Sequence, residues 1–325
     1  MSSPDASGTG SSAPQESQLP NDPALWPDLP YESWTDTRET LHMWTQVAGK
    51  VALALCPMQN HWWQIALHVT PRGLITPNIP YAGLSFTIEF DLAGHALNLA
   101  DSAGRRLSFP LYPRSVADFY KELMSLLGKL GIRVQINTLP QEVPNPIPCD
   151  QDVLHCSYDK EYVDRFRRIL VLTEQVFQAF RGPFLGKCSP VNFWWGSFDL
   201  AVTRFSGRLA PVRPGASLID REAYSHECSS AGFWPGSGRV LEPAYYAYTV
   251  PAPAGIETYP VQPAAAAFNE QMGEFILPYA SVRGSERPAE ALMNFLQTTY
   301  EAGADLGNWD RLALERQPDK KSGII

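Results

Sequence analysis

The sequence predicts an α+β protein built from two divergent copies of one unit, packed with a pseudo-twofold relation. Three observations lead to this fold class. Strand-length apolar runs are separated by short turns. Longer helix-like stretches flank these runs, and the same motifs recur in the same order in both halves. With 325 residues and 44% hydrophobic content, the chain can bury a substantial core.

The clearest internal match follows the first helix-like stretch of each half. In the first half the stretch 40–55 leads to Cys56 and, four residues later, to Asn60-His61-Trp62-Trp63. In the second half the stretch 161–180 leads to Cys188 and, four residues later, to Asn192-Phe193-Trp194-Trp195. The alignment also sets Arg72 opposite Arg204.

A second match lies at the end of each half. Phe109-Pro110-Leu111-Tyr112 precedes a helix that contains residues 122–127, and Phe275-Ile276-Leu277-Pro278-Tyr279 precedes one that contains residues 291–296. Two matches in one order, at equivalent places, predict an internal duplication.

Each unit is expected to run helix, three or four strands, helix. The short spacing between strands predicts antiparallel pairing, because a parallel crossover needs a dozen or more residues. The expected strands are 61–69, 85–90, 96–100, 107–111, 192–205, 223–233, 244–250 and 274–278. The expected divisions are a disordered tail 1–24, a first unit 25–138, a proline-rich linker 139–158, a second unit 159–312 and a flexible tail 313–325.

Composition excludes several classes of partner. The net charge of −8 argues against nucleic acid, which a basic surface would bind, and no apolar run approaches the ~20 residues that span a bilayer. Five cysteines without a C-x-x-C pair indicate a reducing compartment, the cytoplasm. A small molecule is therefore the expected partner, and the oligomeric state stays open.

The Trp-Trp motif supplies the first candidate site. Strand alternation places Trp195, Ser197 and Asp199 on one face, with His61 and Trp63 at the equivalent positions of the first copy. Polar groups on an aromatic-walled face need a network, a ligand or water. One interpretation is a substrate pocket between the halves. The other is a buried hydrogen-bond network that orients the strands.

The segment Tyr224-Ser225-His226-Glu227 supplies the second. In a strand, His226 and Glu227 face opposite sides, so one of them is expected to be structural. His226 suits acid–base chemistry near neutral pH, and Asp199 would orient it or bind a metal. The predicted catalytic set is His226, Asp199, His61 and Glu227.

The cofactor is left open between none and a single metal ion, with haem not excluded. His61, Asp199 and His226 are the candidate metal ligands. A zinc site needs three or four ligands that converge within about 2.0 to 2.3 Å.

Arg204 and Trp234 complete the predicted substrate-binding set of Trp63, Trp195, Ser197, Arg204 and Trp234. The guanidinium of Arg204 suits a carboxylate or phosphate of a ligand, and it equally suits an ion pair with Asp199 or Glu227. The glycine-rich run 232–238 is expected to form a clamp-like loop that places Trp234 over the site.

Between Trp26 and Asp310 the chain resembles a bacterial family catalogued only as a domain of unknown function. The resemblance rests on Asn60-His61-Trp62-Trp63, on the segment 196–208 (GSFDLAVTRFSGR) and on Tyr224-Ser225-His226-Glu227 with 230–236 (SAGFWPG). It implies no activity, so the roles above rest on the residues themselves.

Two functions follow from these observations. The first is a cytoplasmic small-molecule enzyme with an aromatic pocket between the halves and His/Asp acid–base or metal-assisted chemistry. The second is a non-catalytic module that binds a hydrophobic ligand or regulates through the same pocket. Convergence of the polar candidates in one cleft would favour the enzyme.

Overall fold

The computed structural model describes residues 19–212, 214–237 and 240–317. Most of the predicted N-terminal tail and the last eight residues of the C-terminal tail lie outside these ranges, as does Gly238 of the predicted clamp loop. Within the described ranges, no helix has both the length and the apolar character needed to cross a membrane.

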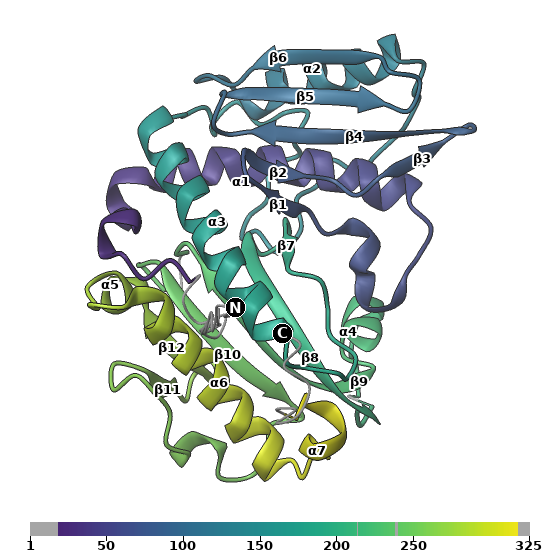
Figure 1. Cartoon of the computed structure of the whole chain (residues 1–325). Helices are drawn as coiled ribbons and strands as arrows, with labels where there is room; N and C mark the ends of the chain where they lie inside the picture. Colours follow the sequence, from purple (N-terminus) through teal and green to yellow (C-terminus); the bar gives the residue numbers. More distant parts are fainter. Residues whose placement is uncertain (1–18, 213, 238–239, 318–325) are drawn as a thin grey trace, which may run out of the picture.

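The first half is a long helix, an antiparallel sheet and a second helix (Figure 1). The strand order is β1-β2-β4-β5-β6, with β3 paired to β4. The elements are η2 (Pro23–Leu25), α1 (Tyr31–Leu55), η3 (Asn60–Ile65), β1 (His68–Thr70), β2 (Gly73–Ile75), β3 (Ile79–Tyr81), β4 (Leu84–Asp91), β5 (Ala96–Asp101), β6 (Arg106–Pro110) and α2 (Val116–Lys129).

The second half begins with a long helix and ends with a helical segment. Its sheet has the order β11-β12-β10-β9-β8-β7. The elements are α3 (Lys160–Arg181), β7 (Asn192–Trp194), β8 (Asp199–Leu209), α4 (Leu218–Ala223), β9 (His226–Trp234), β10 (Ala244–Val250), η4 (Ile256–Thr258), β11 (Ala267–Asn269), β12 (Glu274–Pro278), α5 (Tyr279–Arg283), α6 (Pro288–Leu306) and α7 (Arg311–Leu314).

The predicted α+β class with antiparallel sheets is confirmed, since every strand pair is antiparallel. The two sheets meet edge to edge at one residue pair. The Leu67 N–H donates to the Phe193 carbonyl over 2.9 Å, and the Phe193 N–H donates back over 2.8 Å. This reciprocal bridge brings η3, which precedes β1, next to the second sheet.

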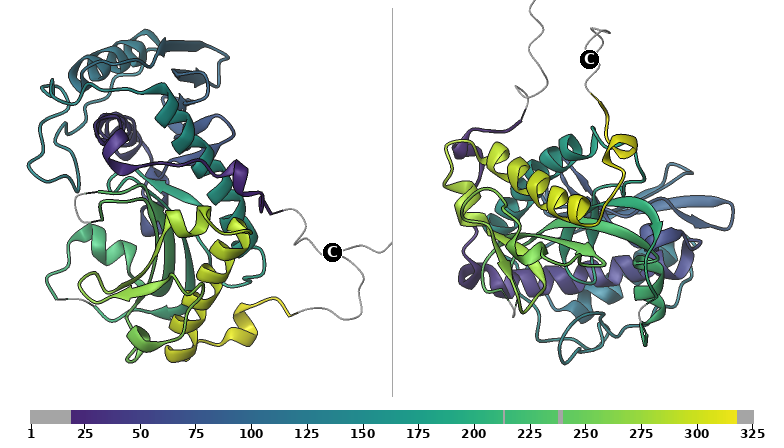
Figure 2. Two further views of the ribbon diagram at one scale, coloured as in Figure 1. Left: turned by 90° about the vertical axis from the view of Figure 1, so that its left-hand side faces the viewer. Right: turned by 90° about the horizontal axis from the view of Figure 1, so that it is seen from below.

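One hydrophobic core spans both halves and holds the layers together. In the first half Phe119 of α2 stacks on Trp44 of α1 at 4.9 Å between ring centroids and contacts Phe90 and Phe109 of the sheet. In the second half α3 and α6 lie side by side across one face of the sheet (Figures 1 and 2). There Tyr245 of β10 shares a hydrogen bond of 2.9 Å with Thr173 of α3.

The Trp-Trp motif differs from its prediction in both halves. The expected strand 192–205 is a hairpin, β7 and β8, whose turn includes Gly196-Ser197 and a left-handed Phe198 (φ 61). Residues 60–65 form a 3-10 segment, not the start of a strand. The two Asn-x-Trp-Trp copies therefore have different backbone conformations, and they do not occupy equivalent strands.

The connecting segments are well anchored. Residues 139–158 contain no helix or strand, as expected, but Gln141 N–H donates to the Gln46 side chain on α1 over 3.0 Å. At the C-terminus, the Leu185 N–H donates to the Leu314 carbonyl over 2.7 Å, and the Arg316 N–H donates to the Pro183 carbonyl over 2.7 Å. The chain thus stays hydrogen-bonded to the fold as far as Arg316.

Candidate functional site

The second sheet has two chemically different faces. Leu200 and Val202 point to the apolar side that α3 and α6 cover, so alternation turns the intervening residues the other way. We call this other side the polar face. Strand register places on it Asn192, Asp199, Thr203, Ser230, Tyr246 and Tyr248.

Hydrogen bonds link hydroxyl groups across the polar face. Thr203 and Ser230 share a bond of 2.9 Å, as do Tyr248 and Tyr224. Gly232 leaves room for the Tyr246 ring on the same face, because a Cβ at this position would lie 2.4 Å from that ring. The side chain of Asn192 is buried without a hydrogen-bond partner among the described residues, which leaves it unsatisfied on a face that otherwise pairs its polar groups.

At one end of the polar face three basic side chains gather. We call His61, Lys187 and His226 the cationic end. The His61 Nδ1 lies 2.9 Å from the Ala223 carbonyl, and its Nε2 lies 2.6 Å from the Lys187 Nζ. A carbonyl only accepts and an ammonium only donates, so His61 is neutral, with its proton on Nδ1. The His226 ring lies 5.8 Å from the His61 ring, between centroids.

Local backbone structure explains why these residues meet. Residues 187–189 run beside β8, where the Phe205 N–H donates to the Lys187 carbonyl over 3.0 Å, and Pro190 separates them from β7. Lys187 therefore lies opposite Phe205 on the polar face. Helix α4 ends at Ala223, whose carbonyl has no partner within the helix and accepts from His61.

His61 itself sits on strained backbone. Both His61 (φ 56) and Trp62 (φ 62) are left-handed, a conformation that costs non-glycine residues on the order of 1–3 kcal/mol each. Consecutive residues of this kind concentrate at functional sites, because surrounding structure must hold them there.

Aromatic rings wall the cationic end. The Lys187 Nζ lies 5.4 Å from the Trp63 ring centroid and 5.0 Å from that of Phe205. Burial lowers the pKa of Lys187, and within the described residues no carboxylate offsets that shift. Burial also lowers the pKa of His61. Lys187, His226 and Trp63 are nevertheless half-buried, so solvent reaches the lysine while His61 lies behind it, 4% exposed.

The opposite end of the polar face is acidic. Asp199 accepts hydrogen bonds from Ser197 and Tyr246, and burial raises its pKa to about 6. Glu142 of the connecting segment lies nearby. Burial and then the charge of Asp199 raise the pKa of Glu142, and its backbone is left-handed (φ 56).

The predicted site residues divide between these places. His61, His226 and Trp63 belong to the cationic end, whereas Asp199 and Ser197 belong to the acidic end. Asp199 and Phe205 are six residues apart on β8, which corresponds to about 20 Å along a strand. Within the described ranges no group of three His, Cys, Asp or Glu side chains could hold a metal ion. The three candidate ligands thus do not form a common set.

Three other candidates lie in structural contacts. The Trp195 Nε1 donates to the Ile65 carbonyl over 2.9 Å, and the ring packs so closely on Gly49 that any side chain there would collide with it. Glu227 accepts from Ser206 over 2.8 Å and pairs with Arg208, away from His226. Trp234 ends β9 beside the acidic end, and its Nε1 is buried without a partner among the described residues.

Arg204 points to the apolar face, not to the site. Its guanidinium lies 3.4 Å from the Phe180 ring centroid, 4.4 Å from Tyr300 and 5.0 Å from Phe184. It donates to the Phe180 carbonyl, and neither Asp199 nor Glu227 pairs with it. Burial lowers its pKa to about 10, which leaves it charged at neutral pH.

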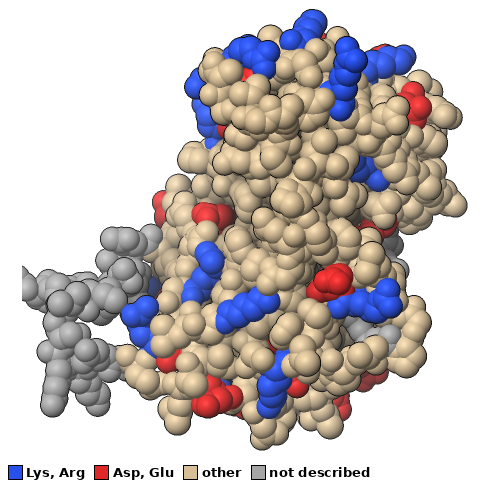
Figure 3. Space-filling view, turned by 90° about the vertical axis from the view of Figure 1, so that its right-hand side faces the viewer, with Lys and Arg blue, Asp and Glu red and all other residues tan. Residues whose placement is uncertain are grey.

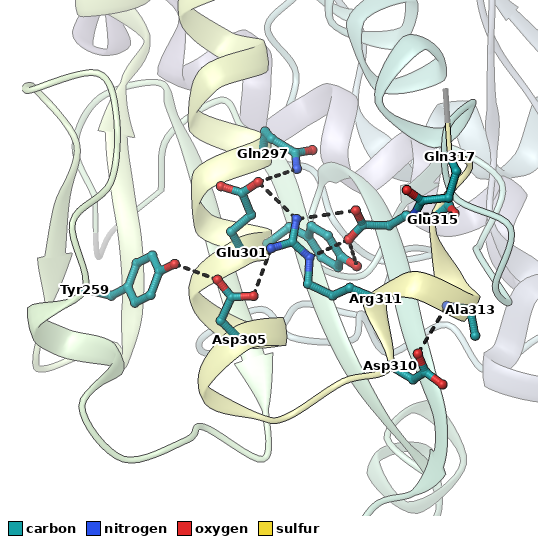
Figure 4. Close-up of polar contacts among 10 residues, drawn as sticks. Tyr259, Gln297, Glu301, Asp305, Asp310, Arg311, Ala313, Glu315 and Gln317 are labelled. Atoms are coloured by element: carbon teal, nitrogen blue, oxygen red, sulfur yellow. Dashed lines mark hydrogen bonds and ion pairs between the residues drawn. The ribbon is translucent and has the colours of Figure 1, made fainter. Parts of the chain in front are cut away.

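A network of surface ion pairs and hydrogen bonds supports Tyr300, one of the three rings around Arg204 (Figure 4). Arg311 of α7 pairs with Glu301 at 3.1 Å and Asp305 at 2.9 Å on α6, and with Glu315 at 2.6 Å. Tyr300 donates to Glu315 over 2.8 Å. The network therefore fixes the ring that covers Arg204, and it ties α7 to α6.

Sequence reasoning missed Lys187, Glu142, Tyr246 and Tyr248. Lys187 stands in a run that resembles a phosphate-binding loop without matching it, and nothing in that run relates it to His61. The alternation in Ala244-Tyr245-Tyr246-Ala247-Tyr248 could have placed two tyrosines on one face of a strand. Glu142 could not have been found, because only the fold brings the connecting segment to Asp199.

Two surface hollows lie elsewhere, along α2 and the segment that follows it. One has a volume of about 620 Å³ and includes Arg114, Lys121 and Glu122 in its lining. Figure 3 shows Lys and Arg side chains gathered at this upper end of the molecule, with basic and acidic side chains mixed below. In its lining, Arg114 pairs with Glu122, and Lys121 lies 4.0 Å from Asp118.

Comparison with protein families is informative for ancestry alone. A family model described as "Family of unknown function (DUF5996)" matches residues 26–316. The chain belongs to this family. The match covers the first half, the polar face and α7, so both ends of the site lie within the family domain. Searches of curated proteins and of solved structures found no match.

Proposed function

We propose that this DUF5996 protein binds a small anionic molecule at the cationic end of the polar face. One observation carries the proposal: Lys187 is half-buried, donates to a neutral His61 and has no carboxylate partner among the described residues. A desolvated ammonium needs a counter-charge, and an anionic ligand would supply it.

The surroundings define the ligand further. His226 can add a second positive charge when it is protonated, and the two unused protons of the Lys187 ammonium can bond a carboxylate or phosphate oxygen. Trp63, which is half-buried, offers flat apolar surface beside the charge. The ligand class is therefore a small carboxylate or phosphate joined to a flat apolar group.

Catalysis is a second candidate function, favoured by Asp199. A carboxyl group with a pKa of about 6 can exchange a proton near neutral pH, and Asp199 is held by Ser197 and Tyr246. In this proposal the protein is a small-molecule enzyme in which His226 and Asp199 serve separate acid–base roles at the two ends. The free thiols of all five cysteines support a place in the cytoplasm.

We also infer that the two halves descend from one duplicated unit. Support comes from topology and not from the Trp-Trp motif. Each half runs from a long helix through an antiparallel sheet, whose strands pair mostly with sequence neighbours, to a second helix: α1 and α2 in one, α3 and α6 in the other.

The binding proposal is tested by calorimetric titration with benzoate and with benzamide, which has the same ring without the charge. We expect benzoate to bind more weakly as salt rises, and benzamide not to bind. Lys187→Met should weaken benzoate binding by about tenfold or more, the loss of one charged contact. Lys121→Met, on an exposed lysine of α2, is the matched control. Equal binding of both ligands, or unchanged binding by Lys187→Met, would refute the proposal.

A further inference from the structure

We propose that Lys187 forms an imine with the carbonyl group of an anionic 2-oxo acid, with His61 as its proton acceptor. This inference rests on the proposed anion site and names the class of ligand that it takes. It adds an activity, covalent capture of a carbonyl compound, to a site that otherwise only binds.

The geometry around the amine is what imine formation requires. The Lys187 Nζ lies 2.6 Å from the His61 Nε2, whose lone pair faces it because the Nδ1 proton is held by the Ala223 carbonyl. If His61 accepts a proton, the same carbonyl stabilises the resulting imidazolium. His61 is therefore placed as a base, and its orientation is fixed from behind.

The surroundings of Lys187 make its ammonium easier to deprotonate. Burial lowers the pKa of Lys187, and no carboxylate among the described residues holds its proton in place. The rings of Trp63 and Phe205 limit the water around Nζ, while its partial exposure leaves an approach for the ligand. The His226 ring lies 5.8 Å from the His61 ring, between centroids, and we assign to it the carboxylate that stands next to the carbonyl.

The chemical step balances without an additional reagent. His61 Nε2 takes one proton from the Lys187 ammonium, and the freed lone pair attacks the carbonyl carbon to form a C–N bond. A proton moves from nitrogen to the carbonyl oxygen, which gives a carbinolamine. His61 then returns its proton to the hydroxyl group, the C–O bond breaks, and water leaves. The product is a protonated imine, and the overall charge is unchanged.

Other lysines provide internal comparisons. Lys50 on α1 is buried, 2% exposed, so that a ligand cannot reach it, and Lys121 has an exposed side chain (72%) near Asp118. Among the described residues, neither has an imidazole partner like that of Lys187. Selective reaction would therefore report the pairing with His61 and not general lysine reactivity.

The experiment traps the imine by reduction. The full-length protein is incubated with phenylglyoxylate, which unites a ring, a carboxylate and a ketone, and with cyanoborohydride; the modified lysines are then mapped by peptide mass spectrometry. We expect Lys187 to be labelled at least about tenfold faster than Lys121, and His61→Gln to slow that labelling by about tenfold or more. Lys187→Arg should remove the adduct because a guanidinium forms no imine under these conditions, with a thermal melt confirming that each variant folds.

The outcomes separate this inference from the binding proposal. If benzoate binds but Lys187 is labelled no faster than Lys121, the imine is refuted and the anion site stands. If Lys187 is labelled selectively although benzoate does not bind, the amine is reactive as proposed and the anion proposal fails. If neither occurs, both are refuted. Unchanged labelling of Lys187 in His61→Gln would contradict the role given to His61.

Discussion

Lys187 and Arg204 lie on neighbouring segments of one sheet edge and point to opposite faces. Cys188 forms a bridge with Arg204, and Lys187 lies opposite Phe205. Both cations contact aromatic rings. Arg204 is 2% exposed inside three rings and bonds a backbone carbonyl, whereas Lys187 is half-buried and donates to a neutral histidine.

This difference separates a structural cation from a functional one. Arg204 fills space that Phe180, Phe184 and Tyr300 enclose, and the Arg311 network holds the third ring in position. Its contribution is packing. Lys187 is not enclosed by three rings in this way. Its ammonium protons that do not point to His61 can therefore bond a ligand.

The largest expected effect is the loss of packing at Arg204. Arg204→Ala would leave a void between the three rings, and we expect it to lower the free energy of unfolding by about 3 to 5 kcal/mol. Urea unfolding followed by tryptophan fluorescence measures this. Arg204→Met retains much of the volume and should lose less. A stability of Arg204→Ala within about 1 kcal/mol of the parent would refute the structural role.

The ionised carboxylate of Asp199 should lower the free energy of unfolding at neutral pH. Its pKa is about 6 in the folded protein against 3.8 in the unfolded chain, so the folded state favours the protonated form. The contribution of Asp199 to stability is therefore full below pH 3.8 and is lost as pH rises through 6. The shift corresponds to about 3 kcal/mol at pH 8.

Asp199→Asn tests that sign. The variant should be more stable than the parent at pH 8, and the difference should shrink toward pH 4. Thermal unfolding of both proteins at the two pH values measures it, with Asp310→Asn, at the N-cap of α7, as a comparison outside the site. A variant that is less stable than the parent at pH 8 would show that the ionised carboxylate is the favoured form.

Lys187→Met, in contrast to Arg204→Ala, should leave the stability of the protein nearly unchanged. We expect its free energy of unfolding to change by less than about 1 kcal/mol, because Lys187 has no ion pair in the described residues to lose. Urea unfolding is the measurement. A loss as large as that of Arg204→Ala would place Lys187 among the structural cations.

The smallest effect is expected at Glu227. Glu227→Gln weakens the contact with Arg208, an ion pair whose arginine is exposed, and should cost under about 1 kcal/mol while benzoate binding stays unchanged. The same titration and unfolding experiments apply. Weaker benzoate binding would return Glu227 to the site that sequence reasoning assigned to it.

The sequence predicted the fold where hydrophobic periodicity is strong. The long helices and strands β4, β5, β6, β10 and β12 lie where the alternation and turn residues place them. Strands β1, β2 and β3 were missed or merged because they have three residues each, too few for an alternation of apolar and polar residues to appear. The hairpin at Gly196-Ser197 was missed because apolar residues continue through the turn.

The site was predicted in part for a similar reason. Unusual residue types in short motifs identified His61, Asp199 and His226, but motif similarity says nothing about distance across a fold. Asp199 was grouped with His61 by an alignment of the two Trp-Trp copies, which have different backbone conformations. Lys187 reaches His61 across 126 residues of sequence, and no local pattern records that contact.

The contact between Lys187 and His61 is tested most directly by nitrogen NMR of the histidine-labelled protein titrated with benzoate. We predict that His61 is neutral with its proton on Nδ1 at pH 7, and that benzoate shifts the resonances of His61 and His226. The resonance of His42, which is buried against the Trp195 and Gly196 carbonyls, should not move. A protonated His61, or ring resonances of His61 and His226 that stay unchanged at saturating benzoate, would contradict the account.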